Sequence, residues 1–181
     1  MCAEFGGELM RRRLMMDQRK SRLYLYNLGD ECNDVTGGWV QQGYIRGGSY
    51  VVTKEESQMS VETAELNDKD GFNASTVTVG TYNSIDLRRY KKIVFVGSFE
   101  VHKFNSIAEI YLTDNLVTAS TLAGAFGSYK EIFKFGSGSS NSGTFEADIS
   151  SSDAGHIAIC ADKWAQFGFS KIVVREMWLE K

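Results

Sequence analysis

The stretch Gly38-Trp39-Val40-Gln41-Gln42-Gly43-Tyr44-Ile45-Arg46 alternates between two sets of side chains with a period of two. One set is Trp39, Gln41, Gly43 and Ile45, and the other is Val40, Gln42, Tyr44 and Arg46. Successive side chains of a β-strand point to opposite faces, so this period indicates a strand rather than a helix. Residues 130–135 alternate in the same way, and residues 92–104 contain the apolar run Ile93-Val94-Phe95-Val96.

Short segments of this kind recur from residue 23 to the end of the chain. The sequence has no proline, so Gly, Asn, Asp and Ser must form the turns between the segments. The predicted strands are 38–46, 50–53, 59–66, 76–79, 92–104, 108–113, 129–135, 142–149, 156–161 and 172–179. We predict an all-β chain whose residues 23–181 form one jelly-roll-like antiparallel β-sandwich. The Gly/Ser-rich stretch 136–143 is predicted to be a hairpin loop between two strands.

The first 22 residues differ from the rest of the chain. They carry six basic and three acidic side chains, and apolar residues recur at roughly helical spacing. We predict a short amphipathic helix over residues 8–20 within an N-terminal segment 1–22 that serves attachment or oligomerisation. The helix fits three partners: the domain itself, further copies of the helix, or an acidic surface. An isolated helix of this length is marginal in water, so each case needs a partner surface.

Composition excludes several classes of protein. A chain of 181 residues with 43% hydrophobic side chains has the size and composition of one globular domain. The net charge of −3 argues against a nucleic-acid partner. No stretch approaches the roughly 18 apolar residues of a membrane span. Charged residues such as Glu4 and Glu8 interrupt the start, so no signal peptide is expected.

Motifs of catalysis are missing from the sequence. The two histidines, His102 and His156, have no acid or thiol beside them at a catalytic spacing, and no GxSxG elbow or phosphate-binding loop occurs. Cys2, Cys32 and Cys160 form no CxxC pair, and we expect two small core residues and one terminal thiol, with a bridge between Cys32 and Cys160 left open. We therefore expect a protein that is not an enzyme and needs no cofactor.

One turn has a pattern that fits a calcium ion. In Asp68-Lys69-Asp70-Gly71-Phe72-Asn73, the oxygen atoms of Asp68, Asp70 and Asn73 are ligands that calcium prefers. Asp, Asn and Gly are also the residues of ordinary turns, so the pattern supports either interpretation.

Aromatic side chains are the remaining candidates for ligand binding. A sugar ring packs its apolar face on Trp or Tyr, while polar neighbours satisfy its hydroxyl groups. Trp164 is the first candidate because its sequence neighbours are polar, and Tyr129, Tyr82 and Trp39 also fall in or beside predicted turns and strand ends.

Several segments together resemble C-terminal domains of phage and prophage tail structural proteins from gut bacteria. They are Arg-Arg-Arg-Leu-Met-Met at 11–16, the run 23–39, Ile85-Asp86-Leu87-Arg88-Arg89-Tyr90-Lys91-Lys92-Ile93, the segments 148–150 and 156–159, and the ending 173–180. The resemblance implies a β-sandwich tip, assembled as a homo-oligomer with a trimer favoured, that recognises cell-surface carbohydrate. It also implies a place in the virion or outside the cell after synthesis in a bacterial cytoplasm.

Three functions are compatible with these observations. The favoured one is a non-catalytic recognition module for surface glycans. The second is a structural assembly or spacer domain of the same kind of particle, and the third is a glycan-acting hydrolase with two close carboxylates in a cleft. All three share the predicted fold, because a fold does not fix a function.

Overall fold

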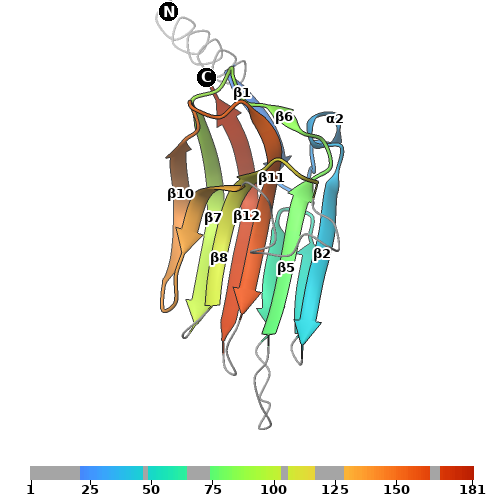
Figure 1. Ribbon diagram of the computed structural model, residues 1–181, viewed down its shortest axis with the longest axis vertical. Helices are drawn as coiled ribbons and strands as arrows, with labels where there is room; N and C mark the ends of the chain where they lie inside the picture. The colour runs from blue at the N-terminus through green and yellow to red at the C-terminus, as the bar shows by residue number, and fades with distance from the viewer. Residues whose placement is uncertain (1–20, 47–48, 65–73, 103–105, 117–128, 164–167) are drawn as a thin grey trace, which may run out of the picture.

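The computed structural model, drawn in Figure 1, describes residues 21–46, 49–64, 74–102, 106–116, 129–163 and 168–181. Within these ranges, twelve strands and one short helix follow one another, and every strand pair is antiparallel. The predicted all-β antiparallel sandwich is confirmed. The predicted N-terminal helix lies outside the described residues.

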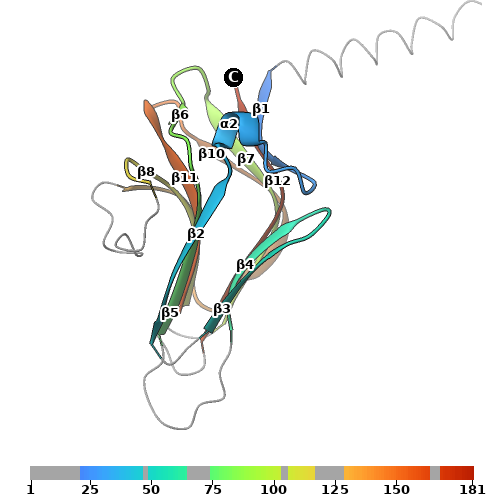
Figure 2. The same cartoon turned by 90° about the vertical axis from the view of Figure 1, so that its right-hand side faces the viewer.

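The strands form two layers, which Figure 2 shows edge on. Sheet A contains, in spatial order, β10 (Ser140–Asp148), β7 (Lys92–His102), β12 (Phe169–Glu180), β4 (Met59–Ala64) and β3 (Ser49–Lys54), with β1 (Arg22–Asn27) also paired to β12. Sheet B contains β2 (Trp39–Arg46), β5 (Ala74–Thr81), β11 (Ala154–Lys163), β8 (Ser106–Thr113) and β9 (Tyr129–Phe135), with β6 (Ile85–Asp86) also paired to β11. The helix α2 (Asn33–Thr36) joins β1 to β2.

The core lies between the sheets and consists of the inward-facing half of each strand. In β7, for example, Ile93, Phe95, Phe99 and Val101 are all buried in it. Aromatic rings connect the layers at one side: Phe99 of sheet A stacks on Phe135 of sheet B at a centroid distance of 3.6 Å. Phe95 stacks on Phe145 at 5.2 Å within sheet A. These contacts join β9 to β7 and β10 across the sandwich.

The Gly/Ser-rich stretch differs from its prediction. Residues 136–139 do not close a hairpin, because β9 pairs with β8 in sheet B and β10 pairs with β7 in sheet A. The connection crosses between the layers, and its backbone is held to β7 by hydrogen bonds from Gly138 N to Val101 O (2.8 Å) and from Val101 N to Ser139 O (2.9 Å). The alternation predicted both strands correctly but not the sheet to which each belongs.

Gly97 permits a close approach between β7 and β12. Gly97 pairs with Val174 of β12, next to a shift in the strand register between Val174 and Glu176. A Cβ atom at position 97 would lie 1.9 Å from the carbonyl oxygen of Val173 and 2.5 Å from the Phe95 ring. Only glycine fits here without moving the backbone of either strand.

The two cysteines that the structure describes are both free thiols. Cys32 is half-buried in the turn before α2, and Cys160 is fully buried in β11. The bridge between them that the sequence left open is therefore not formed. In the described part of the chain, no helix is long and apolar enough to cross a membrane.

Candidate functional site

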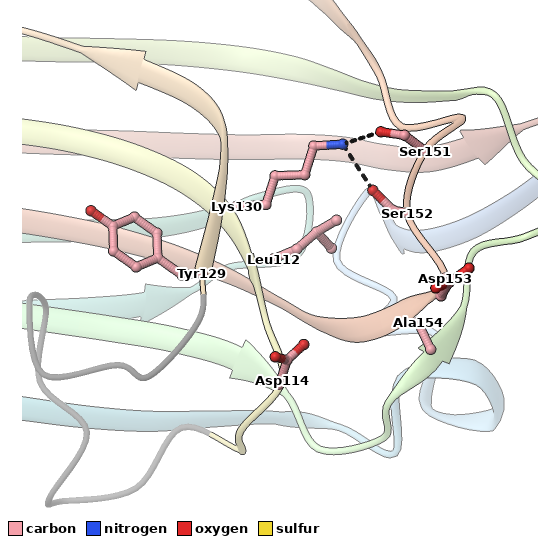
Figure 3. A pocket seen from close by; sticks show the side chains of 8 residues that line it. All are labelled: Leu112, Asp114, Tyr129, Lys130, Ser151, Ser152, Asp153 and Ala154. Atoms are coloured by element: carbon pink, nitrogen blue, oxygen red, sulfur yellow. Dashed lines mark hydrogen bonds between the residues drawn. The ribbon is translucent and has the colours of Figure 1, made fainter.

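Three strand ends of sheet B meet around a hollow, shown in Figure 3. Here β8 ends at Thr113, β9 begins at Tyr129 and β11 begins at Ala154. The hollow has a volume of about 260 Å³, and its lining residues are Leu112, Asp114, Tyr129, Lys130, Ser151, Ser152, Asp153 and Ala154. We call it the end hollow.

Strand register places the side chains of the end hollow. Thr113 pairs with Tyr129, and Leu112 pairs with Lys130. Paired residues of neighbouring strands point to the same face of a sheet. Leu112 points to the core face of β8, so the side chain of Lys130 leaves β9 on that face as well. Its ammonium group then reaches the turn before β11, where Nζ donates to Ser151 Oγ (2.9 Å) and Ser152 Oγ (3.1 Å).

Local hydrogen bonds fix the turn that holds these serines. Ser150 N donates to the Asp148 carboxylate at 2.7 Å. Asp commonly forms turns through a hydrogen bond of this kind. The hydrogen bonds from Ser150 lower the pKa of Asp148 below its usual value. Ile149 is buried, and its N–H donates to Lys91 O at 2.8 Å, so the turn is anchored in the core on one side. The serine hydroxyls therefore occupy defined positions.

Tyr129 stands at the rim of the end hollow on the outer face of sheet B. Its side chain is 47% exposed. Its ring packs edge-on against the buried ring of Tyr111, with centroids 5.6 Å apart and an interplanar angle of 67°. This arrangement is a favourable one for two aromatic rings, and it holds the Tyr129 ring in place while leaving much of it open.

The end hollow combines hydrogen-bond donors with acceptors. Lys130 has three N–H donors, of which two bind the serines. Asp114 and Asp153 are both exposed and supply carboxylate oxygens. Serine hydroxyls both donate and accept. Such a set suits an uncharged ligand that carries several hydroxyl groups.

A buried polar layer lies beside the end hollow on the outer face of sheet B. Both faces of β5 and β11 are buried, whereas a sandwich strand usually exposes every second residue. The hydroxyl of Thr76 donates to the Asp162 carboxylate in this layer. Tyr111, Ala158 and Cys160 form a small apolar cluster within it. Burial raises the pKa of both the Tyr111 phenol and the Cys160 thiol, so neither is ionised at neutral pH.

Glu109 is an unusual member of the polar layer. Its Oε2 atom is buried and has no hydrogen-bond partner among the described residues. Withdrawal from water raises the pKa of the carboxyl group. Lys134 opposes this increase, and the negative charges of Glu131 and Asp162 add to it. A buried carboxylate oxygen without a partner carries an energetic cost, which favours the protonated form of Glu109.

The structure separates the predicted ligand residues. Tyr129 lines the end hollow, and Tyr82 is 56% exposed at the same end of sheet B, one residue after β5, but does not line the hollow. The structure contradicts the candidate role of Trp39 in ligand binding. Its side chain is only 6% exposed and its Nε1–H donates to Leu25 O at 3.2 Å, so the ring belongs to the core. Trp164 lies outside the described residues.

The predicted calcium turn cannot be placed, since Asp68, Asp70 and Asn73 also lie outside the described residues. Within the described ranges, no three His, Cys, Asp or Glu side chains group as a metal site would require. The histidines have other partners: His156 Nδ1 donates to Thr81 O (2.9 Å), and His102 Nε2 lies 2.7 Å from Glu100 Oε1.

Sequence reasoning missed Lys130, Asp114 and the turn 150–153. None of them lies in a recognisable motif, and they are brought together only by the register of β8 with β9 and by the entry into β11.

Comparison with solved structures finds carbohydrate-binding modules. A family 11 module from Clostridium thermocellum, in complex with a β-1,3-1,4-mixed-linked tetrasaccharide, is 12% identical with a TM-score of 0.50, over 88% of this chain and 95% of that one. A mutant family 29 module is 10% identical with a TM-score of 0.49, over 87% and 90%. Another family 29 mutant, complexed with cellulohexaose, is 10% identical with a TM-score of 0.47, over 87% and 89%.

The likeness is one of fold. At 10–12% identity it extends to the β-sandwich of the family 11 module and not to individual residues. No protein-family model matches the chain. No curated protein matches it in sequence.

Proposed function

We propose that this chain is a non-catalytic recognition domain that binds carbohydrate at the end hollow, with Tyr129 as the stacking platform. One observation carries the proposal. The ring of Tyr129 is exposed, packs edge-on against Tyr111, and lies at the rim of a hollow that supplies both hydrogen-bond donors and acceptors. Ligand sites commonly combine an apolar wall with a few fixed polar groups, and sugars need this combination in particular.

The chemistry of a pyranose ring fits each part of the site. Its apolar C–H face packs on an aromatic ring, and its hydroxyl groups both donate and accept hydrogen bonds. Asp114 and Asp153 would accept from hydroxyl groups, and Lys130 would donate to a ring or hydroxyl oxygen. The tetrasaccharide complex of the family 11 module supports the proposal, because that module has the same fold.

The biological setting comes from the sequence resemblance to tail proteins. In that setting the domain works outside the producing cell as one of several copies, with a trimer favoured. Weak individual sites gain roughly 10²–10⁴ in avidity when several copies engage one surface. A small, open hollow is sufficient under those conditions. Sedimentation of the full chain tests the trimer, and a mass of 20.2 kDa at all concentrations contradicts it.

A matched pair of lysines tests the binding function. The full chain is screened on a glycan array, and glycans that it retains are titrated by calorimetry against Lys130→Gln and Lys134→Gln. Both residues belong to β9 and both changes remove one positive charge, but Lys134 contacts Glu131 (2.6 Å) instead of the end hollow. We expect Lys130→Gln to weaken binding at least about tenfold, or 1.4 kcal/mol. Lys134→Gln should bind as the wild type does.

Two results would count against the proposal. One is an array that retains no glycan when the protein is immobilised at high density. The other is equal weakening by both lysine variants, which would indicate a general charge effect. Release of shortened sugars from a retained glycan would contradict the non-catalytic part of the proposal.

A further inference from the structure

We infer that the end hollow binds the terminal ring of a glycan, and that this ring is an uncharged pyranose at the non-reducing end. The inference rests on the proposed function and specifies its ligand. A chain-end site differs from a groove that holds the interior of a polysaccharide, because only one side of the ligand continues out of it.

Size is the first argument. The end hollow has a volume of about 260 Å³. Pockets for drug-sized molecules usually measure about 300–1,000 Å³, so this one is at or below the lower limit of that range. It has room for one sugar ring and part of a linkage, and a row of several rings would extend far beyond it.

Closure on one side is the second argument. The side chain of Lys130 spans from β9 to the turn before β11, and its two hydrogen bonds to Ser151 and Ser152 close the hollow there. The start of β11 is tied down as well, because Ala154 pairs with Asp86 of β6. Leu112, only 6% exposed, forms the floor. A polysaccharide cannot continue on the side that Lys130 and the two serines close, so the bound chain would leave the hollow on another side.

The polar groups favour a terminal ring. A terminal ring has at least one more free hydroxyl group than an interior ring of the same chain, because one of its linkages is missing. Asp114, Asp153, Lys130 and the two serines could bind several hydroxyl groups on a single ring. The exposed part of the Tyr129 ring at the rim would pack on the apolar face of this ring, as the proposed function requires.

The charges of the hollow select against acidic sugars. Two carboxylates and one ammonium group line it. The Lys130 ammonium is also occupied by two hydroxyl groups. A uronic acid would bring a third carboxylate near Asp114 and Asp153, and like charges at short range repel each other. Surface glycans are attached through their reducing ends, so the free end that the hollow meets is the non-reducing one.

Competition with small glycosides tests this inference. Methyl pyranosides of glucose, galactose, mannose and N-acetylglucosamine are titrated against the full chain bound to a retained array glycan. Methyl glucuronide serves as the charged comparison. We expect the glycoside that matches the terminal sugar of the retained glycans to displace them, and methyl glucuronide not to do so. Oligosaccharides of two to six rings should differ in affinity by less than about threefold, equivalent to less than about 0.7 kcal/mol.

Opposite results are easy to recognise. If affinity rises steadily with chain length and no methyl glycoside competes, the site binds chain interiors and the inference is wrong, while the proposed function stands. If Lys130→Gln binds the retained glycans as tightly as the wild type does, the end hollow is not the site, and both statements are wrong.

Discussion

Trp39 offers a test that separates a core role from a ligand role. The sequence offers Trp39 as a candidate ligand contact, with a core position as the alternative, and the structure buries the ring and gives its N–H a specific partner, Leu25 O. The register of β1 with β12 shifts between Tyr24 and Tyr26, so Leu25 has no paired residue in β12. Its carbonyl oxygen can therefore accept the hydrogen bond from the Trp39 indole. Trp39→Phe keeps an aromatic ring but removes the donor from a buried acceptor.

The expected cost follows from these contacts. A buried carbonyl that loses its partner costs about 1–3 kcal/mol. For Trp39→Ala, which also leaves a cavity, the expected loss is about 3–5 kcal/mol. In a chain of this size each kcal/mol lowers Tm by about 2–4 °C, so Trp39→Phe should lower it by about 4–8 °C for a loss of 2 kcal/mol. Calorimetric unfolding measures the loss, and titration with a retained glycan should give wild-type affinity. A Trp39→Phe protein with wild-type Tm and weakened binding would refute the assignment of Trp39 to the core.

Three further predictions concern other parts of the molecule. Gly97→Ala should destabilise the fold by about 1–3 kcal/mol in denaturant unfolding, because its Cβ would meet Val173 O. Gly136→Ala, whose Cβ would have no atom within 4 Å, should leave stability unchanged, and equal effects would contradict the close strand contact. The pKa of Glu109 is raised, so the folded state favours its protonated form, and that contribution is present at acidic pH and lost as pH rises through the raised pKa. Wild-type Tm should therefore fall relative to Glu109→Gln as pH rises above the usual pKa of a glutamate, about 4.3, and a constant difference would contradict the burial of this carboxyl group. Tyr129→Ala should weaken glycan binding about tenfold or more with less than about 1.5 kcal/mol lost in stability, while Tyr82→Ala, three strand spacings or about 14 Å away, should leave binding unchanged.

The strands were largely predictable from the sequence. The apolar run within 92–104 and the apolar ending 172–179 correspond to β7 and β12. Strand β7 begins at Lys92 as predicted, and β12 extends the predicted range by three residues at its start and one at its end. A period of two is a local property, so it survives in any sheet arrangement. The same period cannot say which sheet a strand joins, so it does not distinguish a hairpin at the Gly/Ser-rich stretch from the crossover between sheets that the structure has there.

The candidate site was predictable only in part. Tyr129 and Tyr82 were correctly placed at strand ends, and both are exposed. Trp39 follows two glycines at the start of a predicted strand, next to a turn, and its pairing with Thr81 of β5 places it in the core. Lys130 and Ser151 are 21 residues apart, and only the folded register makes them neighbours. Long-range contacts of this kind leave no local pattern in a single sequence.

The most direct test of the account is an NMR titration of the full chain with a glycan retained on the array. Carbohydrate binding at the end hollow predicts that shift changes concentrate at Leu112, Asp114, Tyr129, Lys130 and the turn 150–154, with little change in β3 and β4 on the far part of sheet A. Changes centred on sheet A, with the end hollow unaffected at saturation, would contradict the central claim.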